Sequence, residues 1–481
     1  MQIQFPAKDP SDVPCDLLAV GAGPDFEGGL AALDARLDGH LLALLKEEGF
    51  HGKPGSSCAL PTLGRLEARR LLVLGTGEGD ADTLRRAAAT AGRAARKQGA
   101  KTVGLAFGES GAGLAAGLVE GFSAGNYLFD RYIREEDRKA ATGTLLLVGV
   151  PADPDAARAA EVRAARQAWA RDLVNSPPED LYPETLAEAA RTLGGIDGVT
   201  VEVWDLARCK AEQCVGIEAV GRGSTREGRL IHVAYHPEGA TQHVALVGKG
   251  ITFDAGGLSL KPSSAMQTMR CDMGGAATML AATGAAAELG LSVAIDCFVG
   301  SAENMTGGRA YKLGDILRYP NGVSVEIHNT DAEGRLVLSD CLIQASRLKD
   351  VTTIVDAATL TGAAVIALGP DFAALFTADD ALADGLLAAA ATNAEGLWRL
   401  PLHQPYKKML KGDWSTIKNV GGRPAGAITA ALFLQHFVGE DKRWAHLDIA
   451  GPAFVDKEHG PYAPGATGEM VRSLVDWLAG L

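Results

Sequence analysis

The feature that most constrains the fold of this chain is a repeated alternation of short apolar runs with segments of helical pattern. Short apolar runs suit buried strands, and alanine-rich stretches with spaced apolar positions suit helices. Such alternation is typical of α/β folds, in which helices cover a mainly parallel sheet. In the first part of the chain the expected strands lie at residues 17–21, 70–75, 102–107 and 144–149, and the expected helices at 82–98 and 114–121.

The same alternation returns after a segment with the pattern of one long helix. Residues 152–170 are rich in Ala and Arg and contain no Gly, and the Ser-Pro-Pro after Asn175 ends a helix. In the rest of the chain the expected strands lie at 199–204, 230–235, 244–248, 293–299, 323–328 and 351–355, and the expected helices at 184–193, 275–289, 336–348 and 380–395. We therefore predict two α/β domains, the larger C-terminal one with a mixed, mainly parallel central sheet. The predicted parts are residues 1–155, a linker helix at 156–172, and residues 173–481.

Two carboxylates and an arginine stand on a predicted strand-to-helix turn. The sequence NTDAEGRL at residues 329–336 places Asp331, Glu333 and Arg335 two residues apart. On such a turn both carboxylates can point to one side and share a metal ion. Taken alone, the pattern also describes a polar loop with a solvated ion pair, because short motifs often match by chance.

A second stretch carries charges where the surrounding sequence is apolar. Lys249, Asp254, Lys261 and Asp272 stand among glycines and apolar residues after the expected strand at 244–248. A buried charge costs free energy unless it is paired or bound to a cation. Together the two stretches supply four carboxylates, a set that suits two divalent cations because hard oxygen ligands favour such ions.

These motifs resemble the leucyl aminopeptidase, or cytosol aminopeptidase, family of two-metal peptidases. Two motifs carry most of the resemblance: VGKGITFDAGG at 247–257 and NTDAEGRL at 329–336. It extends from about residue 171 to the C-terminus, through DAATLTG at 356–362, NVGGR at 419–423 and WAHLDIAG at 444–451. One departure is Ala255, where the family usually has Ser or Thr beside a bridging aspartate. This departure puts one supporting hydrogen bond in question, but no metal ligand.

The resemblance implies a ligand set for two divalent cations, Mn²⁺ or Zn²⁺. Asp254 and Glu333 would bridge the two ions. Lys249 and Asp272 would complete the tighter site, and Asp331 the exchangeable one. A lysine that binds a metal must be neutral, so its pKa has to fall far below the ordinary value of about 10.4. Burial and adjacent cations both act in that direction.

The remaining roles at the site also follow from the resemblance. Lys261 would stabilise the tetrahedral oxyanion. Arg335, which cannot itself act as a base, would hold a bicarbonate ion that does. A metal ion and Asp272 would bind the free α-amine of a peptide, which explains removal of N-terminal residues only. The candidates for the substrate pocket are Met269, Thr359, Leu360 and Gly362.

Composition and the same resemblance predict the protein's surroundings. The net charge of −13 disfavours nucleic acid or an anionic membrane as an obligatory partner. The chain has no apolar run of about 18 residues, its first residues lack a secretory pattern, and its seven cysteines form no C-x-x-C. We expect a reduced, cytoplasmic protein. The resemblance implies a homohexamer, a dimer of trimers, that acts on peptides and carries a macro-like, non-catalytic N-terminal domain.

Several other interpretations stay open at this stage. A glycine pattern at 75–80 and another at 111–116, with Asp130 as ribose acid, fit dinucleotide binding only weakly. His328 beside the turn is a weak candidate ligand, and His446 and Cys271 suit structural, buried positions better than catalysis. The absence of H-E-x-x-H excludes a zincin. A DNA-binding accessory or regulatory role and a two-metal phosphoesterase are the alternatives to a peptidase.

Overall fold

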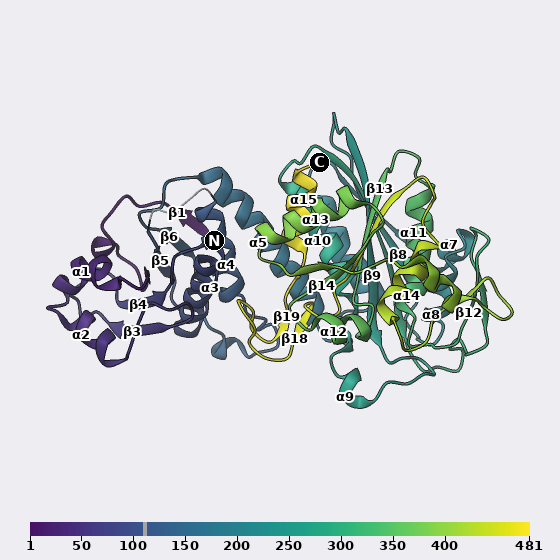
Figure 1. Ribbon diagram of the computed structural model, residues 1–481, viewed down its shortest axis with the longest axis horizontal. Coiled ribbons are helices and arrows are strands. Elements are labelled where there is room, and N and C mark those ends of the chain that lie inside the picture. Colours follow the sequence, from purple (N-terminus) through teal and green to yellow (C-terminus); the bar gives the residue numbers. More distant parts are fainter. Residues whose placement is uncertain (109–112) are drawn as a thin grey trace. The chain divides into compact units, whose positions relative to one another are not determined.

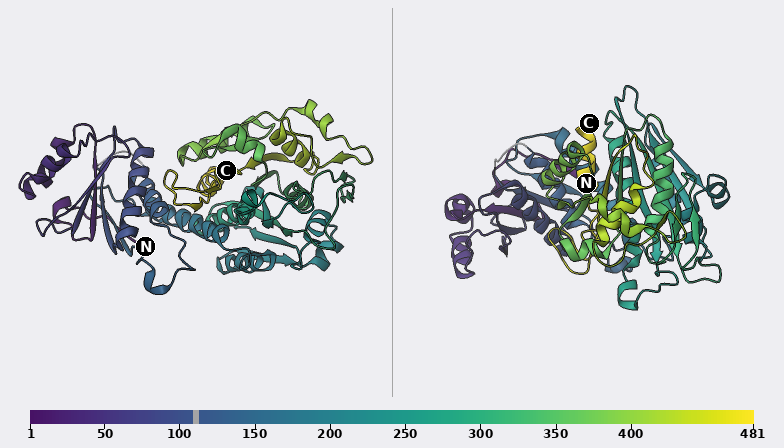
Figure 2. Two further views of the ribbon diagram at one scale, coloured as in Figure 1. Left: turned by 90° about the horizontal axis from the view of Figure 1, so that it is seen from below. Right: turned by 45° about the vertical axis from the view of Figure 1, so that its right-hand side comes forward.

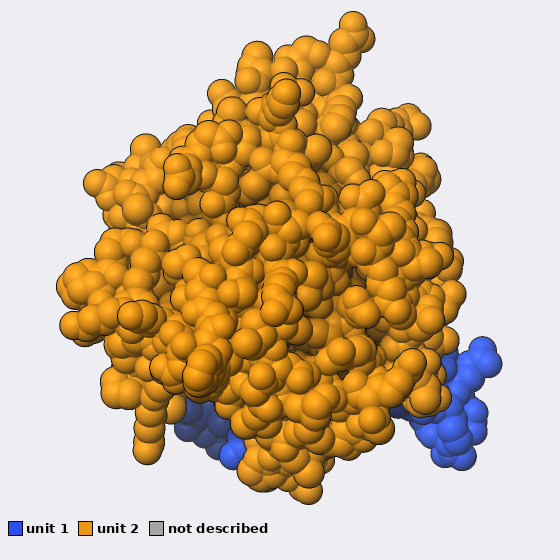
Figure 3. Space-filling view, turned by 90° about the vertical axis from the view of Figure 1, so that its right-hand side faces the viewer, with its two compact units in different colours: residues 1–165, 457–464 blue, residues 166–456, 465–481 orange. Residues whose placement is uncertain are grey.

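The computed structural model describes residues 1–108 and 113–481, which form two compact units, each of α/β type as predicted (Figure 3). Unit 1 comprises residues 1–165 and 457–464, and unit 2 comprises residues 166–456 and 465–481. The predicted linker at 156–172 lies within one helix, α5 (Pro154–Asn175). None of the described helices is long and apolar enough to cross a membrane.

Unit 1 is a six-stranded sheet with helices on both faces (Figure 2). The strand order is β1 (Gln2–Gln4), β6 (Thr144–Leu147), β5 (Thr102–Ala106), β2 (Leu17–Ala22), β4 (Arg70–Gly75) and β3 (Ser57–Pro61), parallel except for β3. Because side chains alternate along a strand, Leu17 and Ala19 pack with α3 (Ala81–Gln98) and α4 (Leu114–Asn126). Leu18 and Val20 pack with α1 (Phe26–Arg36) and α2 (His40–Glu47).

Unit 2 is built on an eight-stranded mixed sheet. Its order is β15 (Leu397–Arg399), β14 (Ala373–Phe376), β17 (Arg443–Asp448), β13 (Thr353–Ala358), β9 (Gln242–Asp254), β10 (Val293–Asn304), β8 (Arg229–Tyr235) and β7 (Val199–Trp204). The four strands from β17 to β10 are parallel, and β8 and β7 are antiparallel to their neighbours. The carboxyl ends of the four parallel strands therefore meet at one edge of the sheet, where open α/β sheets bind their ligands.

Helices cover both faces of this sheet (Figure 1). One group contains α10 (Gly274–Glu288), α13 (Asp380–Thr392) and α15 (Val471–Ala479), and the other contains α8 (Val215–Gly221), α11 (Gly334–Arg347) and α14 (Gly426–Gln435). Helix α10 lies directly on the sheet, because a Cβ atom added to Gly275 would lie only 2.0 Å from the Ala357 carbonyl oxygen. This close approach explains the run of small residues in that helix.

Three features of unit 2 differ from the sequence-based expectation. Strands β9 and β10 are longer than predicted and end at Asp254 and Asn304, so Lys249 lies within a strand and not after one. The strand expected at 323–328 is only β12 (Ser324–Glu326). It belongs to a separate three-stranded sheet with β11 (Ile316–Arg318) and β16 (Ile417–Lys418). A short apolar alternation predicts a strand but not the sheet that the strand joins.

Candidate metal centre

The predicted ligands gather at the carboxyl-terminal edge of the parallel strands in unit 2. Lys249 and Asp254 come from β9, and Asp272 comes from the 3-10 helix η4 (Met269–Met273) that precedes α10. Glu333 is the residue before α11, at the end of the turn that follows β12. Ligand atoms of Asp254, Asp272 and Glu333 all lie within 4.8 Å of one another, and all three side chains are buried.

Lys249 lies between two of these carboxylates. Its Nζ is 2.7 Å from Asp272 Oδ1 and 3.0 Å from Glu333 Oε1, and it donates to the Thr359 carbonyl oxygen at 2.9 Å. A Cβ atom at Gly334 would lie 2.3 Å from Lys249 Cε, so the start of α11 packs against the lysine side chain. This packing and the three polar contacts hold the amine inside the cluster.

Asp254 accepts hydrogen bonds from two groups, and one of them, the side chain of Asn304, is not predicted from the sequence. Its Oδ1 accepts from the Gly256 amide at 2.9 Å and from Asn304 Nδ2 at 2.8 Å. Asn304 lies beside Asp254 in the register of β10 and β9, and a polar residue at the end of a parallel strand was the available signal. With Ala255 in place of a hydroxyl-bearing residue, the aspartate carboxylate still has two donors.

Asp331 lies beside the three-carboxylate group and contacts Lys261 instead. Lys261 Nζ is 2.5 Å from Asp331 Oδ1 and 2.8 Å from Asp254 Oδ2, so the ammonium joins the two carboxylates. Asp331 and Glu333 thus contact different lysines, Lys261 and Lys249. Lys261 is mostly buried and Asp331 is partly exposed, with side-chain exposures of 15% and 31%.

The turn that carries Asp331 and Glu333 is fixed by residues outside it. Asn419 Oδ1 accepts from the His328 amide at 2.8 Å, and its Nδ2 donates to the Asn329 carbonyl oxygen at 2.6 Å. Tyr311 and Asn304 both donate to the carbonyl oxygen of Thr330, at 2.6 and 2.9 Å. The NVGGR motif thus supports the turn. Tyr311 has no signal in the sequence, because it acts only through its place in the fold.

The donor set fits divalent cations. Asp272 Oδ2 and Glu333 Oε2 are buried and have no hydrogen-bond partner among the described residues. Four carboxylates and two ammonium groups leave an excess of two negative charges in a largely buried site. Unpartnered buried oxygens and uncompensated charge are costly unless a cation binds them.

The pKa values of these groups reflect the same excess of negative charge. Burial and the Glu333 carboxylate together raise the pKa of Asp254 to about 6, although Lys261 and Lys249 act in the opposite direction. Burial raises the pKa of Asp272 well above its ordinary value. Burial would lower the pKa of Lys249, but Asp272, Glu333 and Asp254 together raise it above the usual range. The expected fall of the Lys249 pKa therefore does not come from burial alone and would require cations beside the amine.

Arg335 is buried next to the carboxylate group. Its Nη1 donates to the Asn419 carbonyl oxygen at 2.7 Å, and its Nε has no hydrogen-bond partner among the described residues. Burial lowers the pKa of Arg335 to about 10, although Glu333 and Asp448 act against the shift. The guanidinium is therefore charged at neutral pH and has a donor free for an anion.

Of the predicted substrate-binding residues, Thr359 contacts a metal ligand directly and Leu360 follows it in the chain. Thr359 Oγ1 donates to Asp272 Oδ1 at 2.8 Å, and the Leu360 amide donates to Asp448 Oδ1 at 3.1 Å. Met269, at the start of η4, and Leu360 are half-buried, and Gly362 at the start of α12 (Gly362–Leu368) is exposed. The Thr359–Gly362 loop therefore runs from the carboxylate group to the surface.

The other residues considered from the sequence lie apart from the ligand atoms. His328 Nε2 is 2.9 Å from Glu326 Oε1, and His446 Nδ1 is 2.5 Å from Asp356 Oδ1 in the core. Burial raises the pKa of the Cys271 thiol to about 12, which makes a nucleophilic thiolate unfavourable. In the glycine pattern at 111–116, residues 111 and 112 lie outside the described residues.

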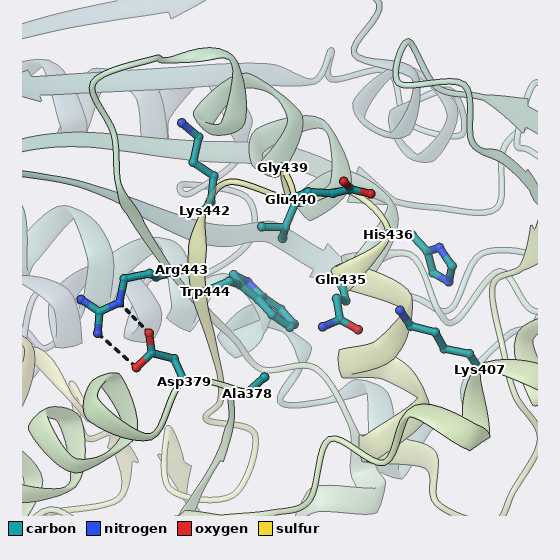
Figure 4. Close-up of a pocket in the computed structure, with 11 residues that line it drawn as sticks. Ala378, Asp379, Lys407, Gln435, His436, Gly439, Glu440, Lys442, Arg443 and Trp444 are labelled. Atoms are coloured by element: carbon teal, nitrogen blue, oxygen red, sulfur yellow. Dashed lines mark hydrogen bonds and ion pairs between the residues drawn. The ribbon is translucent and has the colours of Figure 1, made fainter.

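A cavity of about 700 Å³ opens elsewhere in unit 2 (Figure 4). Its lining includes Lys407, Lys442 and the Asp379–Arg443 ion pair, in which Nε and Oδ2 are 2.6 Å apart. None of the predicted site residues lines it. Its size does not make it the reaction site, because its carboxylates are not gathered as the metal ligands are.

This chain matches two family models and several known proteins. A model described as the cytosol aminopeptidase family, catalytic domain, matches residues 168–475, and one for the N-terminal domain of that family matches residues 17–136. A probable cytosol aminopeptidase of Nostoc punctiforme is 42% identical over 98% of this chain and 99% of its own length. A probable cytosol aminopeptidase of Streptomyces griseus is 41% identical over 96% and 95%.

Solved structures with a similar fold include a leucine aminopeptidase and a maturation enzyme. A mutant of tomato leucine aminopeptidase has a TM-score of 0.91 and 32% identity, covering 100% of this chain and 97% of its own. The bottromycin maturation enzyme BotP in complex with Mn has a TM-score of 0.86 and 37% identity, covering 97% and 99%. The resemblance of the N-terminal part to the family is weak in the sequence alone, because that part contains no motif of predicted site residues.

Proposed function

Because the chain belongs to the cytosol aminopeptidase family and is therefore a metal-dependent aminopeptidase, we propose that it removes leucine and other apolar residues from peptide N-termini at a two-metal site. The observation that supports this most directly is the buried group of Asp254, Asp272 and Glu333, in which two carboxylate oxygens have no hydrogen-bond partner in the described part of the chain. The complex of BotP with Mn supports manganese as one of the ions.

In this proposal Asp254 and Glu333 are shared by both cations. Lys249 and Asp272 hold one of them, and Asp331 holds the other. When bound, the two divalent cations, Mn²⁺ or Zn²⁺, would supply Lewis acidity that polarises a peptide carbonyl and lowers the pKa of a water molecule. Lys249 would have to be neutral to hold a cation, and Asp272 and Glu333, which now contact its amine, would hold the cations with it.

Lys261 and Arg335 act on charge that develops during the reaction. The Lys261 ammonium lies 2.8 Å from Asp254 and is mostly buried, so it would stabilise an oxyanion beside the carboxylates with little screening by water. Arg335 Nε, which has no hydrogen-bond partner among the described residues, would donate to a bicarbonate ion that serves as the base. Asp272 would accept a hydrogen bond from the substrate's α-amine. Thr359, Leu360, Gly362 and Met269 would line the side-chain pocket.

The requirement for a free α-amine gives the test of this function. We expect hydrolysis of L-leucine p-nitroanilide and none of its N-acetylated form, because acetylation removes the amine that the site binds. p-Nitrophenyl phosphate should be left intact. Cleavage of the phosphate ester without cleavage of the anilide would favour the two-metal phosphoesterase instead, and tight DNA retention in low-salt filter binding would favour the accessory role.

We also propose a homohexamer that encloses the active sites and admits short peptides. Large apolar side chains stay exposed in unit 2, as expected for surfaces that other copies cover; they include Leu258, Leu260, Ile366, Trp398 and Trp414. Light scattering should give a mass near six chains, and di- and tripeptides should be cleaved while folded proteins are not. A fully active monomer would contradict both expectations.

A further inference from the structure

A second group of metal-ligating side chains lies in unit 2, away from the carboxylate centre. Asp296 Oδ2 is 3.0 Å from His236 Nε2 and 2.6 Å from His243 Nε2, and Oδ1 is 2.5 Å from His232 Nε2. The ligand atoms of His236, His243 and Asp296 lie within 4.8 Å of one another. None of these residues has a role predicted from the sequence.

The register of the sheet explains why these four residues meet. Asp296 on β10 is opposite Ala234 of β8 and Ala245 of β9. His232 and His243 therefore stand two positions along the neighbouring strands, on the same face as Asp296, and His236 follows the end of β8. Diagonal neighbours at two-residue spacing are within reach of long side chains. Two neighbouring strand segments, β8 with the residue after it and β9, thus place three imidazoles around one carboxylate of β10.

Burial and charge at this group favour a cation. Asp296 is buried, with a side-chain exposure of 3%, whereas His236 is half-exposed at 53% and leaves a path from solvent. Burial would raise the pKa of Asp296, but the hydrogen bonds from His232 and His243 outweigh burial and lower it to about 2. The carboxylate is therefore charged throughout the neutral range.

The distances suit a small borderline metal ion. Zinc bonds to His nitrogen and carboxylate oxygen are about 2.0–2.2 Å long, so two ligands of a tetrahedral ion lie roughly 3.3 Å apart. The separations from Asp296 Oδ2 are 3.0 and 2.6 Å, and side-chain movements of under about 1 Å would open that space. The stacking of His232 on Phe298, with ring centroids 4.3 Å apart, keeps the third imidazole in place.

We propose that His236, His243 and Asp296 bind one transition-metal ion, with zinc as the best match, at a site separate from the catalytic centre. Two imidazoles and a carboxylate prefer such an ion over Mg²⁺ or Ca²⁺. His232 is a positioning residue that holds the other carboxylate oxygen, as partners behind metal ligands commonly do. The ion would link β8, β9 and β10 at the end of the sheet opposite the carboxylate centre.

The two sites stand at opposite ends of one strand. His243 is near the start of β9 and Asp254 is its last residue. At about 3.3 Å per residue, the sites are roughly 35 Å apart. Loss of metal from one should therefore leave the other loaded, and changes at the histidine site should leave the peptidase reaction intact.

The test is a zinc count on the full-length protein. Wild type, His236→Gln/His243→Gln and the control His40→Gln, an exposed histidine at the start of α2, are stripped of metal, dialysed against the same buffered Zn²⁺ and analysed by mass spectrometry of the metal. We expect the double variant to hold one zinc per chain fewer than wild type and control, with activity on L-leucine p-nitroanilide within about twofold of wild type.

Equal zinc contents in all three proteins would overturn the proposal. The histidines and Asp296 would then form a hydrogen-bonded cluster that binds no metal. His236→Gln alone, at a half-exposed position, guards against misfolding of the double variant. It should lower the affinity for the additional Zn²⁺ ion by at least about tenfold. It should also remove the visible absorption that Co²⁺ gives when two imidazoles and a carboxylate bind it. Unchanged affinity and an unchanged Co²⁺ spectrum would likewise reject the site.

Discussion

Asp254→Ala is expected to lose bound metal and peptidase activity together, with kcat/KM at least about a thousandfold below wild type. The Asp254 carboxylate is buried, contacts Lys261 at 2.8 Å and belongs to the group of three carboxylates. Without it, the proposed centre loses a ligand shared by both cations. Metal ions supply several kcal/mol of transition-state stabilisation, and each 1.4 kcal/mol corresponds to about tenfold in rate.

The control for this variant is Asp379→Ala. Asp379 is a carboxylate of unit 2 that pairs with Arg443 beside the other cavity, and its loss should leave metal and activity unchanged. Elemental analysis and circular dichroism on both variants separate metal loss from unfolding. A folded, inactive Asp254→Ala protein with its full metal content would reject Asp254 as a shared ligand.

Lys261→Ala is expected to keep its metal and lose about 10²–10³-fold in kcat, the cost of removing one oxyanion donor. The Lys261 ammonium neutralises Asp254 and Asp331, so its removal makes the centre more negative and should not weaken cation binding. Its contact with substrate is strongest when the carbonyl oxygen carries charge. The fall should therefore appear mainly in kcat, with a smaller change in KM.

Lys312→Ala serves as the matched control for Lys261. Lys312 is an exposed lysine in a surface ion pair with Asp315, and exposed pairs contribute little. Steady-state kinetics of both variants on L-leucine p-nitroanilide, with metal analysis alongside, give the comparison. A rise in KM with kcat unchanged would identify Lys261 as a substrate anchor, and the oxyanion role would be wrong.

The sequence predicts those site residues that differ in charge from their own neighbours in the sequence. Lys249, Asp254 and Asp272 stand out because they are charges among glycines and apolar residues, and the structure buries all three. Asn304 and Tyr311 could not be found in the same way. Their side chains matter only because β10 and the loop after it lie beside the ligand turn, which is a property of the fold.

The positions of helices and strands could be predicted from the sequence, whereas the segments that each of them contacts could be predicted less well. The strand at Arg70–Gly75 and the helix at Gly274–Glu288 follow the expected alternation closely. The joining of residues 457–464 to unit 1 depends on contacts such as Arg93 Nε with Glu458 Oε1, at 3.1 Å. Contacts so distant in sequence leave no local pattern.

The most direct test of the two-metal account is a manganese count per chain, measured together with activity before and after chelation. Mn²⁺ prefers carboxylate centres over imidazole sites, so this count reports on the catalytic centre. The account predicts two Mn²⁺ per chain, loss of L-leucine p-nitroanilide hydrolysis when both are removed, and recovery when Mn²⁺ is restored. Full activity in a protein shown to contain no metal would contradict it.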